Sequence, residues 1–253
     1  MNTSIPNVVN QELRTCYETW LPTLNAQIDL CIQQCNWPKD QVSKVFTMSV
    51  DDAYLEVSPK IMFVGRETAG WHTYDSSDKV DNLMQHYVDV KDRNHNSPFW
   101  WFRKRFSDAL GIGEQFRQAT LWTNLCKIDV NKTKPTGRES FGQLSQLFIT
   151  LLLEEIRITK PDVVLIMTTD GHYNWHLNNY DWIGNSCYDP HNLKPNSLHR
   201  QPLLSGKIEQ LAVESVLPKH TYQIPHPNYL YKKGIADEVL NELTQQILAK
   251  ATI

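Results

Sequence analysis

The chain has 253 residues, enough for one sizeable α/β core, and this length favours one domain over two. A net charge of −3 and a pI near 6.3 exclude a basic field over the whole protein, so a nucleic-acid partner would need a local basic patch. We expect no targeting signal and no membrane segment, because the first residues lack a basic and apolar pattern and no apolar run could cross a bilayer. Five scattered cysteines predict reduced thiols in a cytoplasmic protein.

Helix and strand patterns alternate along the first half of the chain. Residues 8–36 have helical spacing, which Pro22 is expected to break or restart. The apolar run of residues 60–65 predicts a strand. A Ser-Pro pair opens a helix expected over residues 98–110, and residues 119–126 predict a second strand.

The second half continues this alternation. Residues 139–157 predict an amphipathic helix with one buried face. The β-branched run within residues 160–170 predicts a buried parallel strand, and residues 221–225 predict a fourth strand before a last helix over residues 235–249. Residues 175–205 have no period and predict a long functional loop.

This order predicts a three-layer α-β-α sandwich with a central four-stranded, mostly parallel sheet. We expect a single domain over residues 1–253, in which a helical region (1–57) precedes the core (58–230) and a C-terminal helix (231–253). Polar stretches follow the predicted strands in turn: GRETAGW, TNLCK, TTDGHYNW and HPNY. Because ligands bind at the carboxyl ends of parallel strands, these four endings predict one pocket.

The strand-end motifs resemble, in their order, those of the uracil-DNA glycosylase superfamily. VGRETAG corresponds to the first motif of that family, LWTNLCK to the strand that reads the base, and IPHPN to the closing motif. KPDVVLIM also resembles the penultimate strand of the family. The resemblance covers roughly residues 58–230 and implies a DNA glycosylase-like domain that flips a base out of the duplex and leaves an abasic site.

The resemblance implies a role for three residues. Glu67 aligns with the residue that activates water, Asn124 with the residue that reads the base, and His226 with the residue that stabilises the leaving base. The reaction builds positive charge on the sugar and negative charge on the base, so a carboxylate and a hydrogen-bond donor suit it. Further base-binding candidates around the motifs are Arg66, Thr68, Ala69, Gly70, Trp71 and Asn228.

Three positions depart from the pattern of the family. Thr68 stands where Pro is frequent, Ala69 where the uracil-specific branch has Tyr, and Asn228 where Ser is usual. Without the tyrosine ring, we expect a roomier pocket that accepts a substituent at carbon 5 of a pyrimidine. One antiviral branch of the superfamily removes glucosylated hydroxymethylcytosine from phage DNA, and the polar residues 172–200 are expected to contact such a sugar. Alternatives are a uracil-excising repair enzyme, a non-catalytic member that binds nucleic acid or protein, and another nucleotide hydrolase.

DNA is the expected partner, and we expect no cofactor, no metal and no obligate protein partner. Candidate phosphate contacts are Arg103, Lys104, Arg105, Lys127, Lys132, Lys134, Arg138, Arg200, Lys232 and Lys233. Candidate stacking or wedge residues are Trp71, Phe99, Trp100, Trp101, Tyr229 and Tyr231. Four residues after the third predicted strand could suggest a metal site, but we interpret them as polar loop contacts. They are Asp170, His172, His176 and His191.

Structural interpretations of the same residues stay open at this point. Glu67 could form an ion pair with Arg66 or lie in the first turn of a helix. Asn124 could satisfy backbone groups at a strand end, and His226 could be an ordinary loop histidine. Trp71 could belong to the core.

Overall fold

The computed structural model of the chain describes residues 7–93, 96–136, 139–169, 171–179, 198–213 and 216–249. The helices within these ranges are α1 (Val8–Gln34), η1 (Lys39–Gln41), α2 (Asp52–Glu56), α3 (Val80–Lys91), α4 (Pro98–Ala109), η2 (Gly113–Gln115), α5 (Phe116–Ala119), α6 (Glu139–Thr159), α7 (Gly171–Asn179), α8 (Pro227–Lys233) and α9 (Ala236–Leu248). The long helices predicted before the second strand, before the third strand and at the end of the chain are therefore confirmed.

The described strands form one mixed sheet in the order β2-β1-β3-β6-β5-β4. They are β1 (Ile61–Gly65), β2 (Thr120–Asn124), β3 (Val163–Ile166), β4 (His199–Pro202), β5 (Glu209–Ala212) and β6 (His220–Gln223). The four predicted strands are the parallel ones, β2, β1, β3 and β6. The predicted strand count of four is wrong, because β5 and β4 extend the sheet by antiparallel pairing beside β6.

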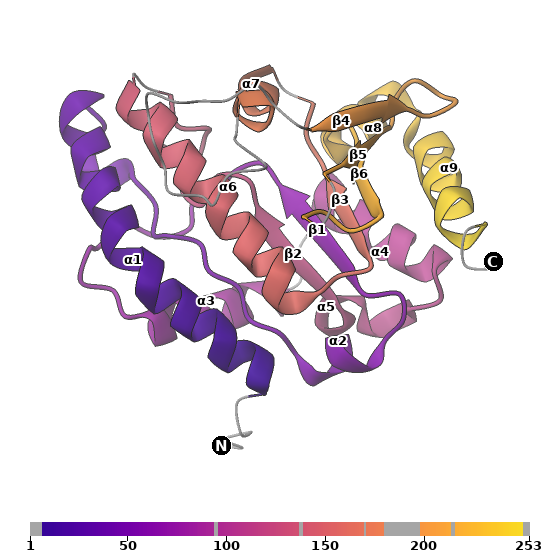
Figure 1. The fold of residues 1–253 in the computed structure, drawn as a ribbon, viewed down its shortest axis with the longest axis horizontal. Helices are drawn as coiled ribbons and strands as arrows, with labels where there is room; N and C mark the ends of the chain where they lie inside the picture. The colour runs from indigo at the N-terminus through magenta and orange to yellow at the C-terminus, as the bar shows by residue number, and fades with distance from the viewer. Residues whose placement is uncertain are drawn as a thin grey trace.

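Helices cover both faces of the sheet, as the sequence predicts. Met62 and Val64 of β1 pack into a core cluster with residues of α1, α3 and α6, whereas Ile61 and Phe63 pack into a second cluster with residues of α4 and α9. Successive strand residues point to opposite faces, so one short strand supplies both cores. Figure 1 shows α1 and α6 side by side over one face, with α4, α8 and α9 gathered on the other.

Two local predictions are corrected. Pro22 lies inside α1 without breaking it. Proline has no N–H to donate to the backbone carbonyl four residues earlier, but this side of the helix is exposed, so water can bond that carbonyl. Tyr17 and Ile28 pack into the core on the buried side of the helix. The predicted loop of residues 175–205 is in part the helix α7 and the strand β4, and residues 180–197 lie outside the described part of the chain.

The carboxyl ends of the parallel strands meet at one edge of the sheet. Gly65 at the end of β1 pairs with Asn124 at the end of β2. The strand order reverses at β1, since β2 lies on one side of it and β3 on the other. Ligands of open α/β sheets bind in the crevice at such a reversal. The fold therefore places the predicted motifs around the expected binding position.

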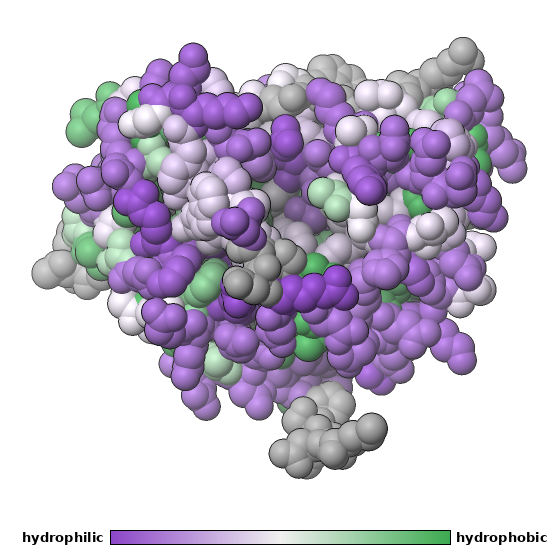
Figure 2. All heavy atoms as spheres, turned by 180° about the vertical axis from the view of Figure 1, so that it is seen from behind, coloured by the Kyte–Doolittle hydropathy of each residue, from purple (hydrophilic) through white to green (hydrophobic). Residues whose placement is uncertain are grey.

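The back of the molecule shows no large continuous apolar area among the described residues (Figure 2). Figure 2 shows the back of the molecule as mostly hydrophilic, with small separate apolar areas. The large apolar side chains that are most exposed in the described chain lie on different elements, and they are Val8, Trp101, Leu204, Tyr229 and Leu248. Within the same ranges, every helix is too short or too polar to serve as a transmembrane span.

Candidate active site

A cavity of about 480 Å³ opens at the carboxyl ends of β1 and β2. Glu67, Asn124 and His226 all line it, although they follow three different strands. The cavity lies within the roughly 300–1,000 Å³ range of pockets that enclose drug-sized ligands. The structure thus brings the three residues of the predicted reaction centre to one site.

Glu67 is held by a tyrosine that the sequence analysis missed. The side chain of Glu67 is only 11% exposed, and Oε2 accepts a short hydrogen bond from the hydroxyl of Tyr173 on α7. Burial and the nearby Cys126 and Glu67 raise the pKa of the Tyr173 hydroxyl far above its usual value, so it stays a neutral donor. Arg66 lies 3.8 Å from the other carboxylate oxygen. Glu67 is therefore fixed in position rather than free to rotate.

His226 is both a helix cap and a cavity residue. It precedes α8, and its Nδ1 accepts from the backbone N–H of Asn228 at 3.2 Å. Burial, together with the charge of Arg66, lowers the pKa of His226 to about 4. The imidazole is therefore neutral near pH 7, and because Nδ1 is an acceptor the proton lies on Nε2. The cap leaves Nε2–H as the donor for a ligand.

Asn124 has an oriented amide with an unused donor. The residue is 2% exposed, and Oδ1 accepts from Nε1 of Trp122 at 3.2 Å. Since the indole can only donate, this contact fixes which end of the amide is the oxygen. Nδ2 is buried without a partner in the described part of the chain. A Cβ on Gly65 would lie 2.3 Å from Oδ1, so only glycine fits beneath this amide.

The loop after Glu67 is tied down by Asp129. Oδ2 of this buried carboxylate accepts from the hydroxyl of Thr68 at 2.6 Å and from the backbone of Gly70 at 3.0 Å. The prediction that Thr68 binds the base is wrong, because its side chain is 1% exposed and faces Asp129 and Ser43. Ala69 and Gly70 do line the cavity.

Aromatic rings form part of the cavity wall. Phe99, Trp100 and Trp122 line the cavity together with Trp71, which is 4% exposed and belongs to the core as well. The ring centroids of Trp100 and Trp122 lie 5.3 Å apart in an edge-on arrangement. Trp101 points away from this wall and is 44% exposed. The cavity therefore joins an apolar wall to a few polar groups, as ligand pockets usually do.

Two predicted phosphate contacts are wrong. Arg103 is fully buried, with its guanidinium 4.5 Å from the ring centroid of Trp100 and a hydrogen bond of 2.9 Å to Thr120 Oγ1. Lys127 is fully buried as well, and its ammonium donates to Glu155 Oε2 at 2.7 Å. Neither cation can reach DNA, because the core encloses both side chains.

The other predicted DNA contacts differ in whether their side chains are exposed and whether they form ion pairs within the protein. Arg105 forms an ion pair of 2.5 Å with Asp237, and Arg200 forms one of 2.6 Å with Glu209. Lys132, Lys232 and Tyr229 are exposed. Asn228, predicted to bind the base, is also exposed, and its side chain does not line the cavity. Lys134 is half-buried, and Arg138 lies outside the described residues. Lys132 packs beside Gly70, at 3.4 Å from the position of a Cβ there, and so lies next to the cavity.

The proposed sugar contacts and the metal question fall largely on residues that the structure does not describe. Asp170 and His191 lie outside the described ranges, as do the side chains of His172 and His176. Among the remaining described residues, no three His, Cys, Asp or Glu side chains gather closely enough to hold a metal ion.

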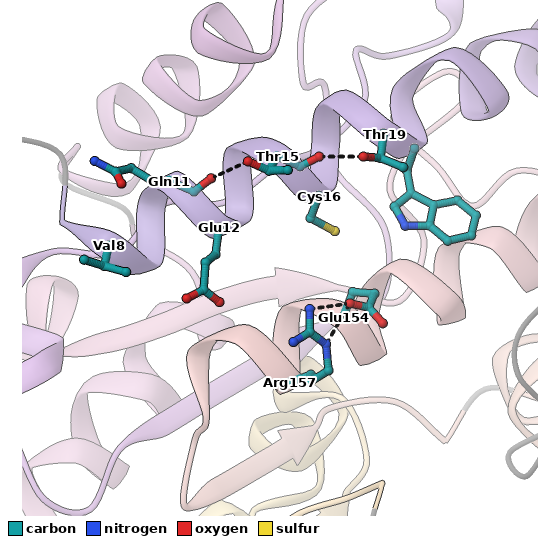
Figure 3. Close-up of a pocket in the computed structure, with 9 residues that line it drawn as sticks. Val8, Gln11, Glu12, Thr15, Cys16, Thr19, Glu154 and Arg157 are labelled. Atoms are coloured by element: carbon teal, nitrogen blue, oxygen red, sulfur yellow. Dashed lines mark hydrogen bonds and ion pairs between the residues drawn. The ribbon is translucent and has the colours of Figure 1, made fainter.

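A second hollow, of about 440 Å³, lies between α1 and α6. Figure 3 shows its polar groups in contacts of their own: the hydroxyl of Thr15 donates to Gln11 O, and Arg157 pairs with Glu154 at 2.8 Å. Burial and nearby glutamates raise the pKa of the Cys16 thiol to about 12, so it is not a reactive thiolate. This groove lacks the convergent unpaired groups of the strand-end cavity.

Sequence reasoning missed several cavity residues for different reasons. Trp122 lies two positions before Asn124 in β2, and period-two alternation predicts that both share a face. Tyr173 and Asp129 lie 106 and 61 residues from the partners they hold, and no local pattern indicates such contacts.

Models of known protein families give no match to this chain, and no curated protein matches its sequence. Its function must therefore be argued from the site itself.

Proposed function

We propose that the protein is a DNA glycosylase of the uracil-DNA glycosylase superfamily that excises a flipped pyrimidine carrying a substituent at carbon 5. The observation that carries the proposal is the convergence of Glu67, Asn124 and His226 on one cavity from three strand ends. The proposed substrate is modified phage DNA, such as DNA with glucosylated hydroxymethylcytosine, and the proposed role is antiviral defence.

Glu67 serves the sugar side of the reaction. As the N-glycosidic bond breaks, its electron pair leaves with the base and positive charge develops on the sugar. The carboxylate stabilises that charge and takes a proton from the water whose oxygen bonds to the sugar carbon. Tyr173 and Arg66 hold the carboxylate in one orientation. The product is an abasic site.

His226 serves the base side. The departing base gains negative charge on its carbonyl oxygen, and the Nε2–H of a neutral imidazole can donate to it. A donor of this kind is typically worth about 10²–10³ in rate. Arg66 lines the same cavity and adds a positive charge that favours the anion. The cap from Asn228 keeps the ring in the donating tautomer.

Asn124 and the aromatic wall serve recognition. The free Nδ2 donates to the base, while Oδ1 has a second lone pair beyond its contact with Trp122. The edge of uracil and the edge of cytosine each offer a donor beside an acceptor, so the amide can match either. Ala69 and Gly70 line the cavity without a bulky side chain, and the cavity volume exceeds what a bare pyrimidine ring fills.

DNA contact is assigned to the exposed groups around the cavity. Lys132 lies beside Gly70, and Tyr229 and Lys232 belong to the helix that His226 caps. These groups were predicted as DNA contacts, and they remain candidates now that Arg103 and Lys127 are known to be buried.

The test is base excision from four matched DNAs that contain uracil, unmodified cytosine, hydroxymethylcytosine or glucosylated hydroxymethylcytosine. Abasic sites are read by alkaline strand cleavage after incubation with purified protein. Excision confined to modified cytosine is expected. Excision of uracil alone would make the protein a repair enzyme, and binding of DNA without excision of any base would favour a non-catalytic member.

A further inference from the structure

The cavity extends from the predicted reaction centre toward α3. This part is lined by Trp71 and His72 from the loop after β1, by His86 from α3, and by Arg93 just after that helix. We call these four residues the α3 lobe. None of them lies at a strand end, and Trp71 is the one member with a role above, as part of the aromatic wall.

Two nitrogens of the lobe lack partners. Nε1 of Trp71 and Nε2 of His86 are buried, and neither has a hydrogen-bond partner in the described part of the chain. Leaving a buried polar group without a partner is unfavourable, and a buried tryptophan N–H usually finds an acceptor. Both residues line the same cavity, so a ligand there can supply the missing partners.

Three of the four lobe residues are held by ring packing. The rings of Trp71 and His86 lie edge to face with centroids 4.6 Å apart, and those of His72 and His86 lie 4.4 Å apart at 90°. The backbone N–H of Trp71 also points to Asp129 Oδ2 at 3.4 Å. Polar groups that packing fixes in this way lose little freedom when they bind a ligand.

An aromatic wall connects the lobe to the amide that is proposed to read the base. Trp122 donates to Asn124 Oδ1 at 3.2 Å, and its ring lies 5.6 Å from the ring of Trp71. A substituent on a base held by Asn124 can follow this wall into the lobe. Burial, with the charges of His72 and Arg93, lowers the pKa of His86, which favours a neutral imidazole with one donor and one acceptor.

The chemistry of the lobe selects the class of substituent. Trp71 can only donate, Arg93 can only donate, and neutral His86 can do either. Hydroxyl groups accept from such donors and also donate, so they satisfy both histidine tautomers without adding charge. We propose that the α3 lobe is a binding subsite for a neutral, hydroxyl-rich substituent on carbon 5 of the excised pyrimidine, an inference that rests on the proposed function.

The experiment compares hydroxymethylcytosine DNA with glucosylated hydroxymethylcytosine DNA in single-turnover excision. Trp71→Phe removes the indole N–H and keeps an aromatic ring, and His86→Leu removes the unpaired nitrogen. Trp20→Phe is the matched control, because Trp20 lies in the groove between α1 and α6. The readout is the ratio of kcat/KM for the glucosylated DNA to that for the hydroxymethylated DNA.

We expect both lobe variants to lower this ratio by roughly tenfold, and the control to leave it unchanged. A general packing defect would lower both rates and spare the ratio. An unchanged ratio in both variants, with the wild type active, overturns the subsite and leaves the proposed function standing. A wild type that excises neither base overturns the proposed function and the subsite with it.

Discussion

Two neighbouring residues of β2 point into two different polar regions, one with unpaired groups among the described residues and one in which the polar groups bond one another. Asn124 enters the strand-end cavity, where its Nδ2 lacks a partner among the described residues. Thr123 enters a buried cluster with Tyr17, Lys127 and Glu155, which we call the Glu155 cluster. In that cluster the hydroxyl of Tyr17 donates to Glu155 at 2.9 Å, and Lys127 donates to both Thr123 and Glu155.

The difference separates polar groups that support the fold from polar groups that we propose to bind a ligand. The side chains of the Glu155 cluster are 0–2% exposed, and they satisfy one another across α1, β2 and α6. Within the described part of the chain, the cavity instead keeps nitrogens without hydrogen-bond partners on Trp71, His86 and Asn124. A native protein tolerates such groups where function requires them.

The comparison predicts its largest effect in the Glu155 cluster. Lys127→Met leaves the buried carboxylate of Glu155 without its cation, so the free energy of unfolding should fall by about 3–5 kcal/mol. The double change Lys127→Met with Glu155→Leu should cost less, since no unpaired charge remains. Urea unfolding followed by circular dichroism measures both. Equal losses in the single and double variants would show that the ion pair is not the stabilising feature.

In the cavity, His226→Asn should affect excision rather than folding. Asparagine still caps α8, but its shorter side chain cannot place a donor where Nε2–H lies. The rate of excision should fall about 10²–10³-fold. A wild-type rate in this variant would remove His226 from the reaction.

The same substitution should change how stability depends on pH. The pKa of His226 is about 4 in the folded protein and 6.5 when unperturbed. Between these values the unfolded chain binds more protons, so the contribution of this group to stability is complete above pH 6.5 and is lost as the pH falls toward 4. In His226→Asn, urea unfolding should show a weaker loss of stability over this window than in the wild type.

A smaller effect is expected for the residue that positions Glu67. Tyr173→Phe removes the hydroxyl that donates to the carboxylate and keeps the buried ring. Because this contact orients a reacting group, kcat should fall by about tenfold while KM changes little. A rise in KM with an unchanged kcat would place Tyr173 in substrate binding instead.

The smallest effect is expected at the surface. Lys132→Ala should weaken DNA binding by a few-fold and lower the slope of log K against log[salt] by about 1. Lys207→Ala, in the exposed turn between β4 and β5, is the matched control and should change neither. Fluorescence anisotropy over a salt series measures both slopes. Identical slopes in the two variants would move the DNA-binding face away from Lys132.

Period and apolar content were sufficient to predict the parallel strands and the helices α1, α4, α6 and α9, whereas α3 was not predicted. The β4–β5 hairpin escaped prediction because His199–Pro202 and Glu209–Ala212 are polar and do not alternate clearly. The helix α7 escaped because Gly171–Asn179 is rich in Asn and His and has no clear apolar face.

For the site, strand-end placement was sufficient to predict that the ends of β1, β2 and β6 share a cavity. The fourth predicted ending, TTDGHYNW after β3, contributes no described residue to the lining and reaches the site through the hydrogen bond from Tyr173 to Glu67. Side-chain burial was less predictable. Arg103 and Lys127 were expected at the surface because charged residues are almost never fully buried, yet aromatic rings enclose the first and Glu155 pairs with the second. Long-range partners such as Tyr173 can be found only once the fold is known.

The central claim is that Glu67 performs chemistry that the rest of the cavity only supports. Its most direct test is Glu67→Gln in single-turnover excision of glucosylated hydroxymethylcytosine, with DNA affinity and urea unfolding measured on the same preparation. Glu12→Gln, in the groove between α1 and α6, is the matched control. The account predicts that Glu67→Gln lowers the rate by about 10²–10⁴-fold and leaves affinity and stability near wild type. A wild-type rate in Glu67→Gln would contradict it.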